Sequence, residues 1–216
     1  MVQPPFVDGL SRSDQINQYT QGYGQLAVDL VAAGWSPFLL VLRFRHLGGR
    51  HDAVLAQMHR EAERAHRWLS TRVWRNWQAP SRRDWCPVWI LAPDYPVAKG
   101  AKIGARSALR DLVPNDGLHL QGVAVMPPGG RLREPLDEHL GVDGARYCPR
   151  GGPLVSLTAV PITSDLAYVH GYNFKALARG RACFDDILVL PASSTELNSQ
   201  PRPAADPWRH PVLVRR

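Results

Sequence analysis

Five short apolar runs, each followed by proline or glycine, constrain the fold of this chain more than any other feature of its sequence. Apolar runs of roughly four to eight residues bounded by such turn residues are typical of strands inside a sheet. The first run, FLLVL at 38–42, continues to residue 45 with alternating polarity. We therefore predict strands at 38–45, 86–96, 117–126, 154–160 and 187–190.

Between some of these runs, apolar residues recur at steps of three and four, which predicts helices. The clearest case follows Asp52, which can cap a helix in which Val54, Met58 and Leu69 recur on one face. Some strands have too little helix between them for a doubly wound parallel sheet. We therefore expect an α+β fold with a mostly antiparallel central sheet and helices packed on its faces. Further helices are predicted at 24–33, 98–113, 136–140 and 165–177.

A chain of 216 residues is long enough for one domain with a full core, and hardly for two. We assign residues 24–191 to this domain. Residues 1–23 are polar and contain prolines, so they are expected to form a flexible segment. Residues 192–216 are rich in Ser, Pro and Arg, a composition typical of a disordered basic tail.

The sequence favours a reducing compartment. Cys86, Cys148 and Cys183 lie far apart and form no CxxC pair, which also excludes a zinc ribbon. The N-terminal residues lack the basic start and apolar block of a secretory signal. No apolar run approaches the roughly 20 residues of a membrane span. We expect a cytoplasmic protein with no membrane partner.

A formal charge of +7 favours an anionic partner, since clustered Arg and Lys gain affinity by displacing counterions from phosphates. Charge alone does not separate nucleic acid from a merely basic surface. Two basic residues lie on the first predicted strand, and four form a stripe on the helix predicted at 98–113. A solvated helix face is the alternative for the stripe. The six candidate phosphate contacts are Arg43, Arg45, Lys99, Lys102, Arg106 and Arg110.

Two polar side chains stand at the start of the third predicted strand. His119 and Gln121 point to one face, because alternate residues of a strand share a face. Burying an imidazole and an amide without partners would cost roughly a few kcal/mol each. A divalent cation is one suitable partner, since imidazole nitrogen and amide oxygen are acceptable ligands for Mg²⁺ or Mn²⁺. Hydrogen bonds to neighbouring loops are the alternative.

The helix predicted at 165–177 places Tyr168, Tyr172 and Lys175 on one side of successive turns. A tyrosine can attack a phosphodiester and hold it as a phosphotyrosine ester. Because a phenol is a poor nucleophile at neutral pH, a nearby metal and a lysine would both lower the barrier. The alternative is that the two rings only pack, since Tyr19 and Tyr23 have the same spacing without a following lysine.

These residues resemble the motifs of the HUH-type rolling-circle replication initiators, which run in the order apolar strand, His-hydrophobic-His strand, tyrosine helix. Here that order is FLLVLRF, HLQ and YVHGYNFK. HLQ is similar to the His-hydrophobic-Gln variant of some initiators. YVHGYNFK resembles their two-tyrosine signature, with Gly171 where an intermediate lysine often stands. Relaxases of conjugation place the tyrosine before the histidine strand, so Tyr19 and Tyr23 keep a relaxase-like nickase as an alternative.

The resemblance implies a palm-like sheet and a Mg²⁺- or Mn²⁺-dependent endonuclease that nicks one DNA strand. Such an enzyme stays attached to the 5′ phosphate and leaves a 3′ hydroxyl. Carried over by position, His119 and Gln121 would be metal ligands. Tyr172 would be the principal nucleophile and Tyr168 the second, although Gly171 puts the activation of Tyr168 in doubt. Lys175 would position or activate the phosphate.

A third metal ligand is expected, because two side chains do not hold Mg²⁺ alone. The sequence does not choose among four candidates, which are Glu61, Glu63, His66 and Asp94.

The resemblance also implies partners, namely single-stranded DNA or a DNA hairpin at an origin, a host polymerase and a host helicase. A host helicase is expected because the chain contains no G-x-x-x-x-G-K-[ST] motif. The main alternative is a non-catalytic DNA-binding protein on the same fold. A primase-like palm enzyme would need two carboxylates on one strand, such as D-x-D, and the sequence has none.

Overall fold

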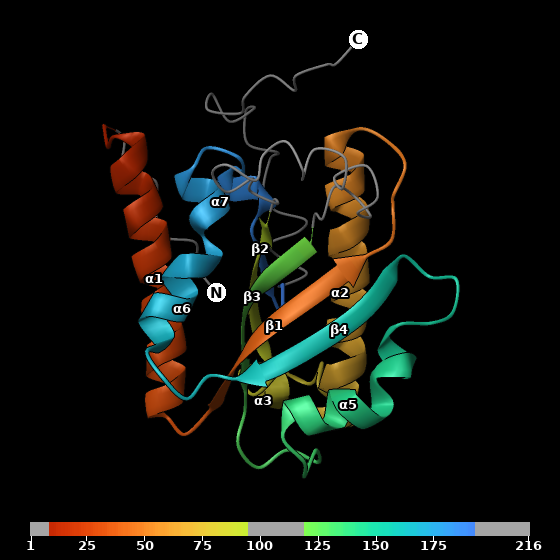
Figure 1. Cartoon of the computed structure of the whole chain (residues 1–216). Helices are drawn as coiled ribbons and strands as arrows, with labels where there is room; N and C mark the ends of the chain where they lie inside the picture. The colour runs from red at the N-terminus through yellow and green to blue at the C-terminus, as the bar shows by residue number, and fades with distance from the viewer. Residues whose placement is uncertain (1–8, 95–118, 193–216) are drawn as a thin grey trace.

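The computed structural model of the chain describes residues 9–94 and 119–192 (Figure 1). Within these residues five strands form a sheet in the order β4-β1-β3-β2-β5, and every neighbouring pair is antiparallel. The prediction of an α+β fold with an antiparallel central sheet is therefore confirmed. The strands are β1 (Ser36–Phe44), β2 (Val88–Asp94), β3 (His119–Met126), β4 (Leu154–Pro161) and β5 (Leu188–Leu190).

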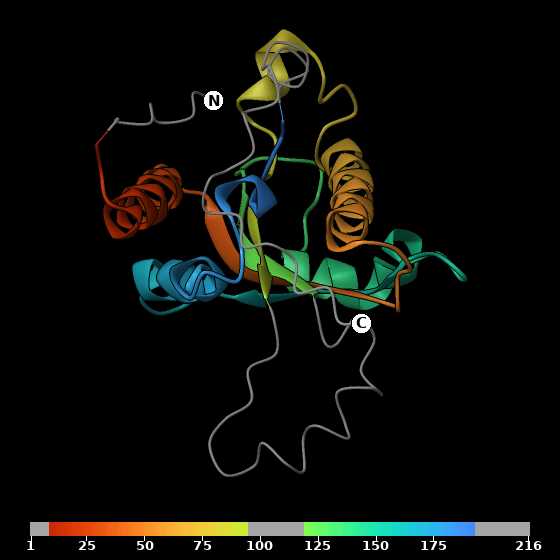
Figure 2. The same cartoon turned by 90° about the horizontal axis from the view of Figure 1, so that it is seen from above.

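Helices flank the sheet on both faces (Figure 2). α2 and α5 lie on one side, and α1, α6 and α7 lie on the other. The helices are α1 (Arg12–Ala32), α2 (His51–Val73), α3 (Pro80–Arg83), α5 (Leu136–Tyr147), α6 (Leu166–Asn173) and α7 (Lys175–Ala178), with a short 3-10 helix η3 (Phe184–Asp186) before β5.

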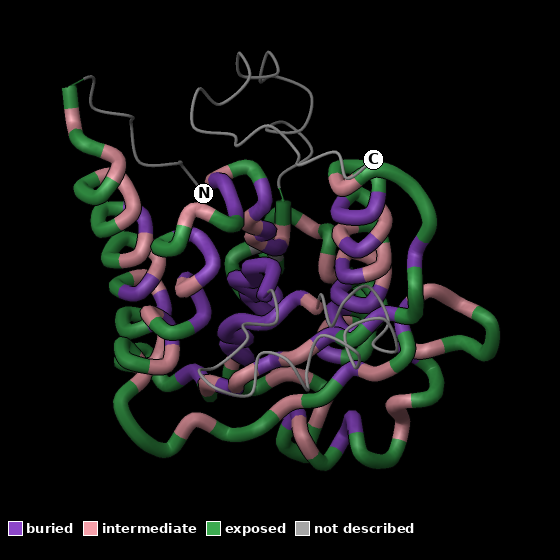
Figure 3. Tube along the Cα trace, turned by 45° about the horizontal axis from the view of Figure 1, so that its top comes forward, coloured by how far each residue is buried: buried purple, intermediate pink, exposed green. Residues whose placement is uncertain are grey.

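Successive side chains of each strand point to opposite faces of the sheet, so the hydrophobic core has two parts. Leu40 and Leu120 belong to the part that packs against α2 and α5. Val123 and Ile90 belong to the part that contains Phe174 and the residues of α1. Figure 3 shows that the central strands are mostly buried, whereas the outer face of α1 is mostly exposed. Each face of the sheet therefore has its own helical cover.

α1 begins well before the helix predicted from residue 24. Ser11 caps it by accepting a hydrogen bond from the backbone N–H of Asp14 at 3.2 Å. Tyr19, in the middle of the helix, is buried against Phe184 with 4.6 Å between ring centroids. The boundary placed at residue 23 falls inside α1, because a polar stretch with a good cap and a buried tyrosine on its inner face extends the helix.

Two other helices differ from their predictions. α5 runs on to Tyr147 instead of ending at residue 140, since Tyr147 is buried against the core. The helix predicted at 165–177 is two helices, α6 and α7, which meet at Phe174. The helix predicted at 98–113 lies outside the described residues, as does almost all of the predicted tail. Among the described helices, none has both the length and the apolar character that crossing a bilayer requires.

Gly122 allows β2 and β3 to approach closely in the middle of the sheet. A Cβ atom at this position would overlap the carbonyl oxygen of Ile90 on β2. Glycine is therefore required here for steric reasons. The close approach lies beside the Gln121–Ala92 pair and sets the β2–β3 register that continues to the end of both strands.

Candidate active site

Four side chains form a row across the sheet where β2 ends and β3 begins. Asp94 of β2 lies opposite His119 of β3, which lies opposite Arg43 of β1, and Arg43 lies opposite Ser156 of β4. Residues directly opposite each other in antiparallel strands project to the same face. The row therefore presents a carboxylate, an imidazole, a guanidinium and a hydroxyl side by side.

This row faces the helices that carry the tyrosines. Gln121 and Val123 follow His119 at steps of two, so the three side chains share a face. Val123 packs in the part of the core that includes Phe174, the residue between α6 and α7. The two polar residues predicted on one face of the strand thus point toward the segment that contains Tyr172.

Asp94 lies at the centre of the site. It is 7% exposed, and its Oδ2 lies 2.7 Å from Lys175 Nζ and 3.5 Å from His119 Nε2. The structure thus brings together a residue from β2, one from β3 and one from α7. Of the four candidates for a third metal ligand, Asp94 is the one that lies beside His119.

Lys175 connects this carboxylate to a tyrosine. Its ammonium group donates a hydrogen bond of 3.1 Å to Tyr172 Oη and lies 4.2 Å from the centroid of the same ring. The Tyr172 side chain is 54% exposed, so the phenol is open to a large ligand. Three successive contacts, each of 3.5 Å or less, link Tyr172 to His119 through Lys175 and Asp94.

The break between the two helices sets the direction of Lys175. α6 ends at Asn173, and Phe174 is both its C-terminal cap and the residue before α7. The Phe174 ring is buried in the core, which fixes this joint against the sheet. Lys175, the first residue of α7, therefore reaches toward the end of β2 while remaining in contact with Tyr172. The prediction of one continuous helix that carries Tyr168, Tyr172 and Lys175 is therefore wrong.

The environment of Lys175 affects its protonation. Burial lowers the pKa of Lys175, but hydrogen bonds and charges from Asp94 and Tyr172 outweigh burial and raise the pKa above its ordinary value. Lys175 therefore carries a positive charge at neutral pH.

Several buried polar side-chain atoms on β2, β3 and α6 have no hydrogen-bond partner among the described residues. Within the described parts of the chain, Asp94 Oδ1, Gln121 Nε2 and both polar side-chain atoms of Asn173 are buried without a hydrogen bond. A buried polar atom without a hydrogen bond lowers the stability of the fold. Such atoms are therefore candidates for contact with a ligand or an ion. Asn173 directly follows Tyr172 in the sequence, and it is a buried polar residue that the spacing of the tyrosines and the lysine does not predict.

The donor set fits a hard divalent cation. Asp94 would supply a carboxylate oxygen and His119 an imidazole nitrogen. Gln121 would supply its amide oxygen only in the reversed amide orientation, because its buried atom without a hydrogen bond is Nε2. Oxygen-rich sets with one imidazole suit Mg²⁺ or Mn²⁺. The described residues contain no group of three or more His, Cys, Asp and Glu side chains placed for a metal, so Gln121 is needed to complete this set.

The other candidates for the third ligand belong to α2, on the opposite face of the sheet. His66 is buried, and its Nε2 donates to the carbonyl oxygen of Pro87 at 2.7 Å. Burial lowers the pKa of His66 to about 4, so the ring is neutral. Glu61 accepts from Arg64 at 2.8 Å. These residues, and Glu63 on the same helix, do not join the row.

Tyr168 is positioned differently from Tyr172. It lies in the first turn of α6, where its backbone N–H donates to the Asp165 side chain, and it is 70% exposed. Lys175 contacts Tyr172 and Asp94, and no contact with Tyr168 is found among the described residues. The structure thus brings one of the two predicted nucleophiles to the row and leaves the other at the surface.

The predicted DNA-binding residues are only partly described. Arg43 is exposed, stands in the row and donates from Nε to Ser156 Oγ at 3.1 Å. Arg45 is exposed just beyond the end of β1, and its backbone N–H donates to Pro153. The other four lie outside the described residues, namely Lys99, Lys102, Arg106 and Arg110.

The earlier tyrosine pair has a packing role. Tyr19 and Tyr23 contact each other with 5.6 Å between ring centroids, and Tyr23 stacks on Phe174 at 6.5 Å. Burial raises the pKa of Tyr19 to about 12. These rings hold α1 against the α6–α7 joint, and Tyr19 is not exposed to a substrate.

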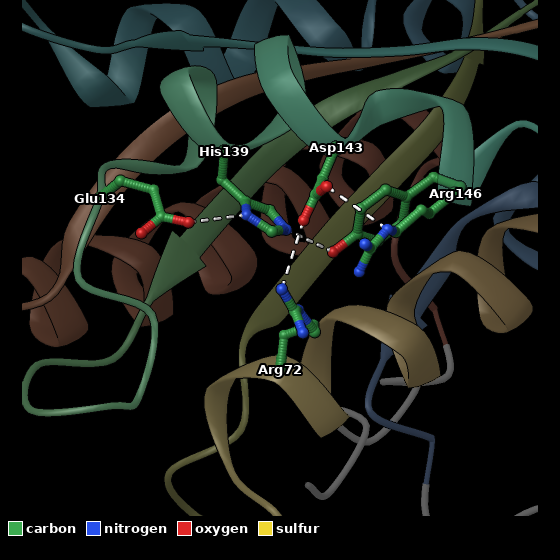
Figure 4. A network of polar contacts seen from close by, with 6 residues as sticks. Arg72, Glu134, His139, Asp143 and Arg146 are labelled. Atoms are coloured by element: carbon green, nitrogen blue, oxygen red, sulfur yellow. Dashed lines mark hydrogen bonds and ion pairs between the residues drawn. The ribbon is translucent and has the colours of Figure 1, made fainter.

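A second polar network lies on α5 and α2, on the opposite face of the sheet (Figure 4). His139 is buried between Glu134, at 3.0 Å from Nδ1, and the Tyr147 hydroxyl, at 2.8 Å from Nε2. Asp143 pairs with Arg72 at 3.3 Å. Burial raises the pKa of Tyr147 to about 12. Both nitrogens of His139 are thus satisfied, and the network joins α5 to α2 as a structural element.

Comparisons of this chain with protein-family models, with curated proteins and with solved structures return no match.

Proposed function

We propose that this chain is a metal-dependent single-strand DNA endonuclease and strand transferase of the rolling-circle initiator kind, with Tyr172 as its nucleophile. One observation carries the proposal, namely the contact path from the exposed Tyr172 phenol through Lys175 to Asp94 and His119. A tyrosine, a lysine and a metal-ligand set on one face of a sheet are the parts that phosphoryl transfer to a phenol requires.

The metal ligands in this proposal are Asp94, His119 and Gln121. A bound Mg²⁺ or Mn²⁺ would polarise the oxygens of the scissile phosphate. The burial of Asp94 supports this role, because a cation would offset part of the cost of burying a carboxylate whose Oδ1 has no hydrogen bond.

In the proposed step, Tyr172 Oη attacks the phosphorus of a phosphodiester and the bond to the 3′ oxygen breaks. The phenol loses its proton and the departing 3′ oxygen gains one, so the products are a 5′-phosphotyrosine and a 3′ hydroxyl. Lys175 assists because an ammonium that donates to Oη favours the phenolate. The energy of the broken bond is kept in the phosphotyrosine and allows later rejoining.

Arg43 is proposed to bind the DNA backbone beside the reacting phosphate. It neighbours His119 in the row and is exposed. A guanidinium is well suited to a phosphate because it offers parallel N–H donors. The substrate proposed on this basis is single-stranded DNA or a hairpin at an origin, and a host helicase and a host polymerase would act with the enzyme in the cytoplasm.

Tyr168 is proposed as a second nucleophile that acts after the first cleavage. Its 70% exposure leaves it accessible, while its lack of a described lysine partner supports a weaker role than that of Tyr172. Gly171, which stands where related signatures often have a lysine, agrees with this ranking.

Covalent capture tests the proposed function. Purified protein is incubated with single-stranded oligonucleotides and Mn²⁺ and then boiled in detergent. The wild type is expected to give a protein–DNA band that Tyr172→Phe lacks, while oligonucleotide binding by Tyr172→Phe is retained. Tyr23→Phe, at a packed tyrosine, is the matched control and should keep the band. DNA binding without any covalent band in the wild type would instead establish the non-catalytic alternative.

A further inference from the structure

The ammonium group of Lys175 occupies the carboxylate that the proposed metal site needs. Lys175 Nζ lies 2.7 Å from Asp94 Oδ2, and the two side chains are only 20% and 10% exposed. The same Oδ2 lies 3.5 Å from His119 Nε2. The Lys175 ammonium group is therefore paired with the same carboxylate oxygen that lies near the His119 imidazole.

A divalent ion held by both Asp94 and His119 would lie on this side of the carboxylate. Ligand atoms of Mg²⁺ lie roughly 2.0 to 2.1 Å from the ion, and Oδ2 and Nε2 are close enough to share one ion after a small movement. The ammonium group and the ion would then meet at one oxygen, where like charges repel across a short, partly desolvated distance. The two cations therefore compete for Asp94.

We propose that Lys175 and the divalent metal ion are alternative partners of Asp94, so that metal binding releases the Lys175 ammonium from Asp94 for the substrate phosphate. This inference rests on the proposed function, because it concerns the same metal site. In the metal-free state Lys175 and Asp94 neutralise each other. In the metal-bound state the ammonium keeps Tyr172 as a partner and has N–H donors available for a phosphate.

The position of Lys175 explains how it can change partners without a large movement. It already contacts Tyr172 Oη at 3.1 Å and the ring at 4.2 Å, so the second partner is in place before the first is lost. Lys175 is the first residue of α7, directly after the buried Phe174, and its backbone is therefore held while its long side chain swings. Metal binding would thus free the ammonium group for a substrate phosphate while its hydrogen bond to Tyr172 is kept.

Arg43 provides a matched control. It lies opposite His119 in the sheet, but its Nε donates to Ser156 and no contact with Asp94 is found among the described residues. Removing Arg43 therefore changes the local charge by the same amount without removing a competitor for Asp94. A general electrostatic effect would alter both variants alike, whereas competition would alter only the Lys175 variant.

The test is the affinity of the full chain for Mn²⁺ without DNA, measured by calorimetry and by the paramagnetic signal of unbound Mn²⁺. We expect Lys175→Met and Lys175→Gln to bind Mn²⁺ about tenfold more tightly than the wild type. Arg43→Met should change the affinity by less than about threefold. Two Lys175 variants are used because Gln has an amide N–H that can donate to Tyr172 whereas Met has no donor, and circular dichroism verifies that each folds.

Equal or weaker Mn²⁺ binding by both Lys175 variants would overturn the inference, as would tighter binding by Arg43→Met to the same degree. Absence of Mn²⁺ binding in every protein would overturn it together with the metal site. If the Lys175 variants bind more tightly but the wild type gives no covalent DNA adduct, the exchange of partners stands and the proposed nicking function fails.

Discussion

Asp94 and His119 stand directly opposite each other on β2 and β3, and their side chains meet at 3.5 Å. This relationship depends on the register of the two strands. A slip by one residue would send one of the side chains to the opposite face of the sheet, toward α2. The residues that fix the register are therefore as important to the site as the polar residues themselves.

Asp94→Asn is expected to weaken Mn²⁺ binding by at least about tenfold, because an amide lacks the charge that a hard cation prefers. Calorimetry on the variant and the wild type measures the change. Glu61→Gln is the control, since Glu61 pairs with Arg64 on the other face and should leave the affinity unchanged. An equal loss of Mn²⁺ affinity in both variants would show that Asp94 is not a metal ligand.

Gly122→Ala is expected to destabilise the protein by about 1 to 3 kcal/mol, since the added methyl group overlaps the carbonyl oxygen of Ile90. It should also weaken Mn²⁺ binding by shifting β3 against β2. Gly141→Ala on α5 is the matched control, because open space surrounds that position. Urea unfolding measures both variants. If Gly122→Ala is as stable as the wild type, the close strand approach is incorrect.

Acid should destabilise the fold between about pH 6.5 and pH 4. Burial lowers the pKa of His66 and the pKa of His170 from 6.5 to about 4. Below pH 6.5 the unfolded chain binds a proton at each histidine and the folded chain does not. The stability present above this pH is therefore lost as the pH falls, by about 1.4 kcal/mol per pH unit for each group.

Urea unfolding at a series of pH values measures this slope. His66→Gln should make the slope shallower in this window, whereas His46→Gln, at an exposed position, should leave it unchanged. An identical slope in the wild type and in His66→Gln would mean that His66 is protonated in the folded protein.

Arg43→Ala is expected to weaken binding of single-stranded DNA and to reduce the slope of log affinity against log salt by about 0.7, the contribution of one phosphate contact. Fluorescence anisotropy of a labelled oligonucleotide at several salt concentrations gives the slope. Arg146→Ala on α5 removes an exposed arginine from the opposite face and should change neither quantity. An unchanged slope in Arg43→Ala would exclude Arg43 from the interface.

The sequence predicted the strands and the shared face of His119 and Gln121 because period-two alternation and bounding turn residues are local signals. It did not choose Asp94 over His66, since that choice depends on strand order and register, which only long-range pairing defines. Both residues are buried, but His66 satisfies its ring at Pro87 while Asp94 retains an unpartnered oxygen.

Local signals predict the bounds of two helical segments incorrectly. Tyr168, Tyr172 and Lys175 have regular helical spacing, yet Phe174 enters the core and divides the segment in two. α1 begins before its predicted start at residue 24. Few of its residues are buried, so the apolar periodicity that predicts a helix is weak in its first half. Tertiary packing overrides local periodicity in both cases.

Tyr172 is proposed to form a covalent bond to the 5′ phosphate of a cleaved strand. The most direct measurement is mass spectrometry of the adduct after nuclease and protease digestion. We expect a nucleotide on the peptide that contains Tyr172, linked through its 5′ phosphate, together with a released strand that ends in a 3′ hydroxyl. A nucleotide attached at any other residue, or cleaved DNA with Tyr172 unmodified, would contradict it.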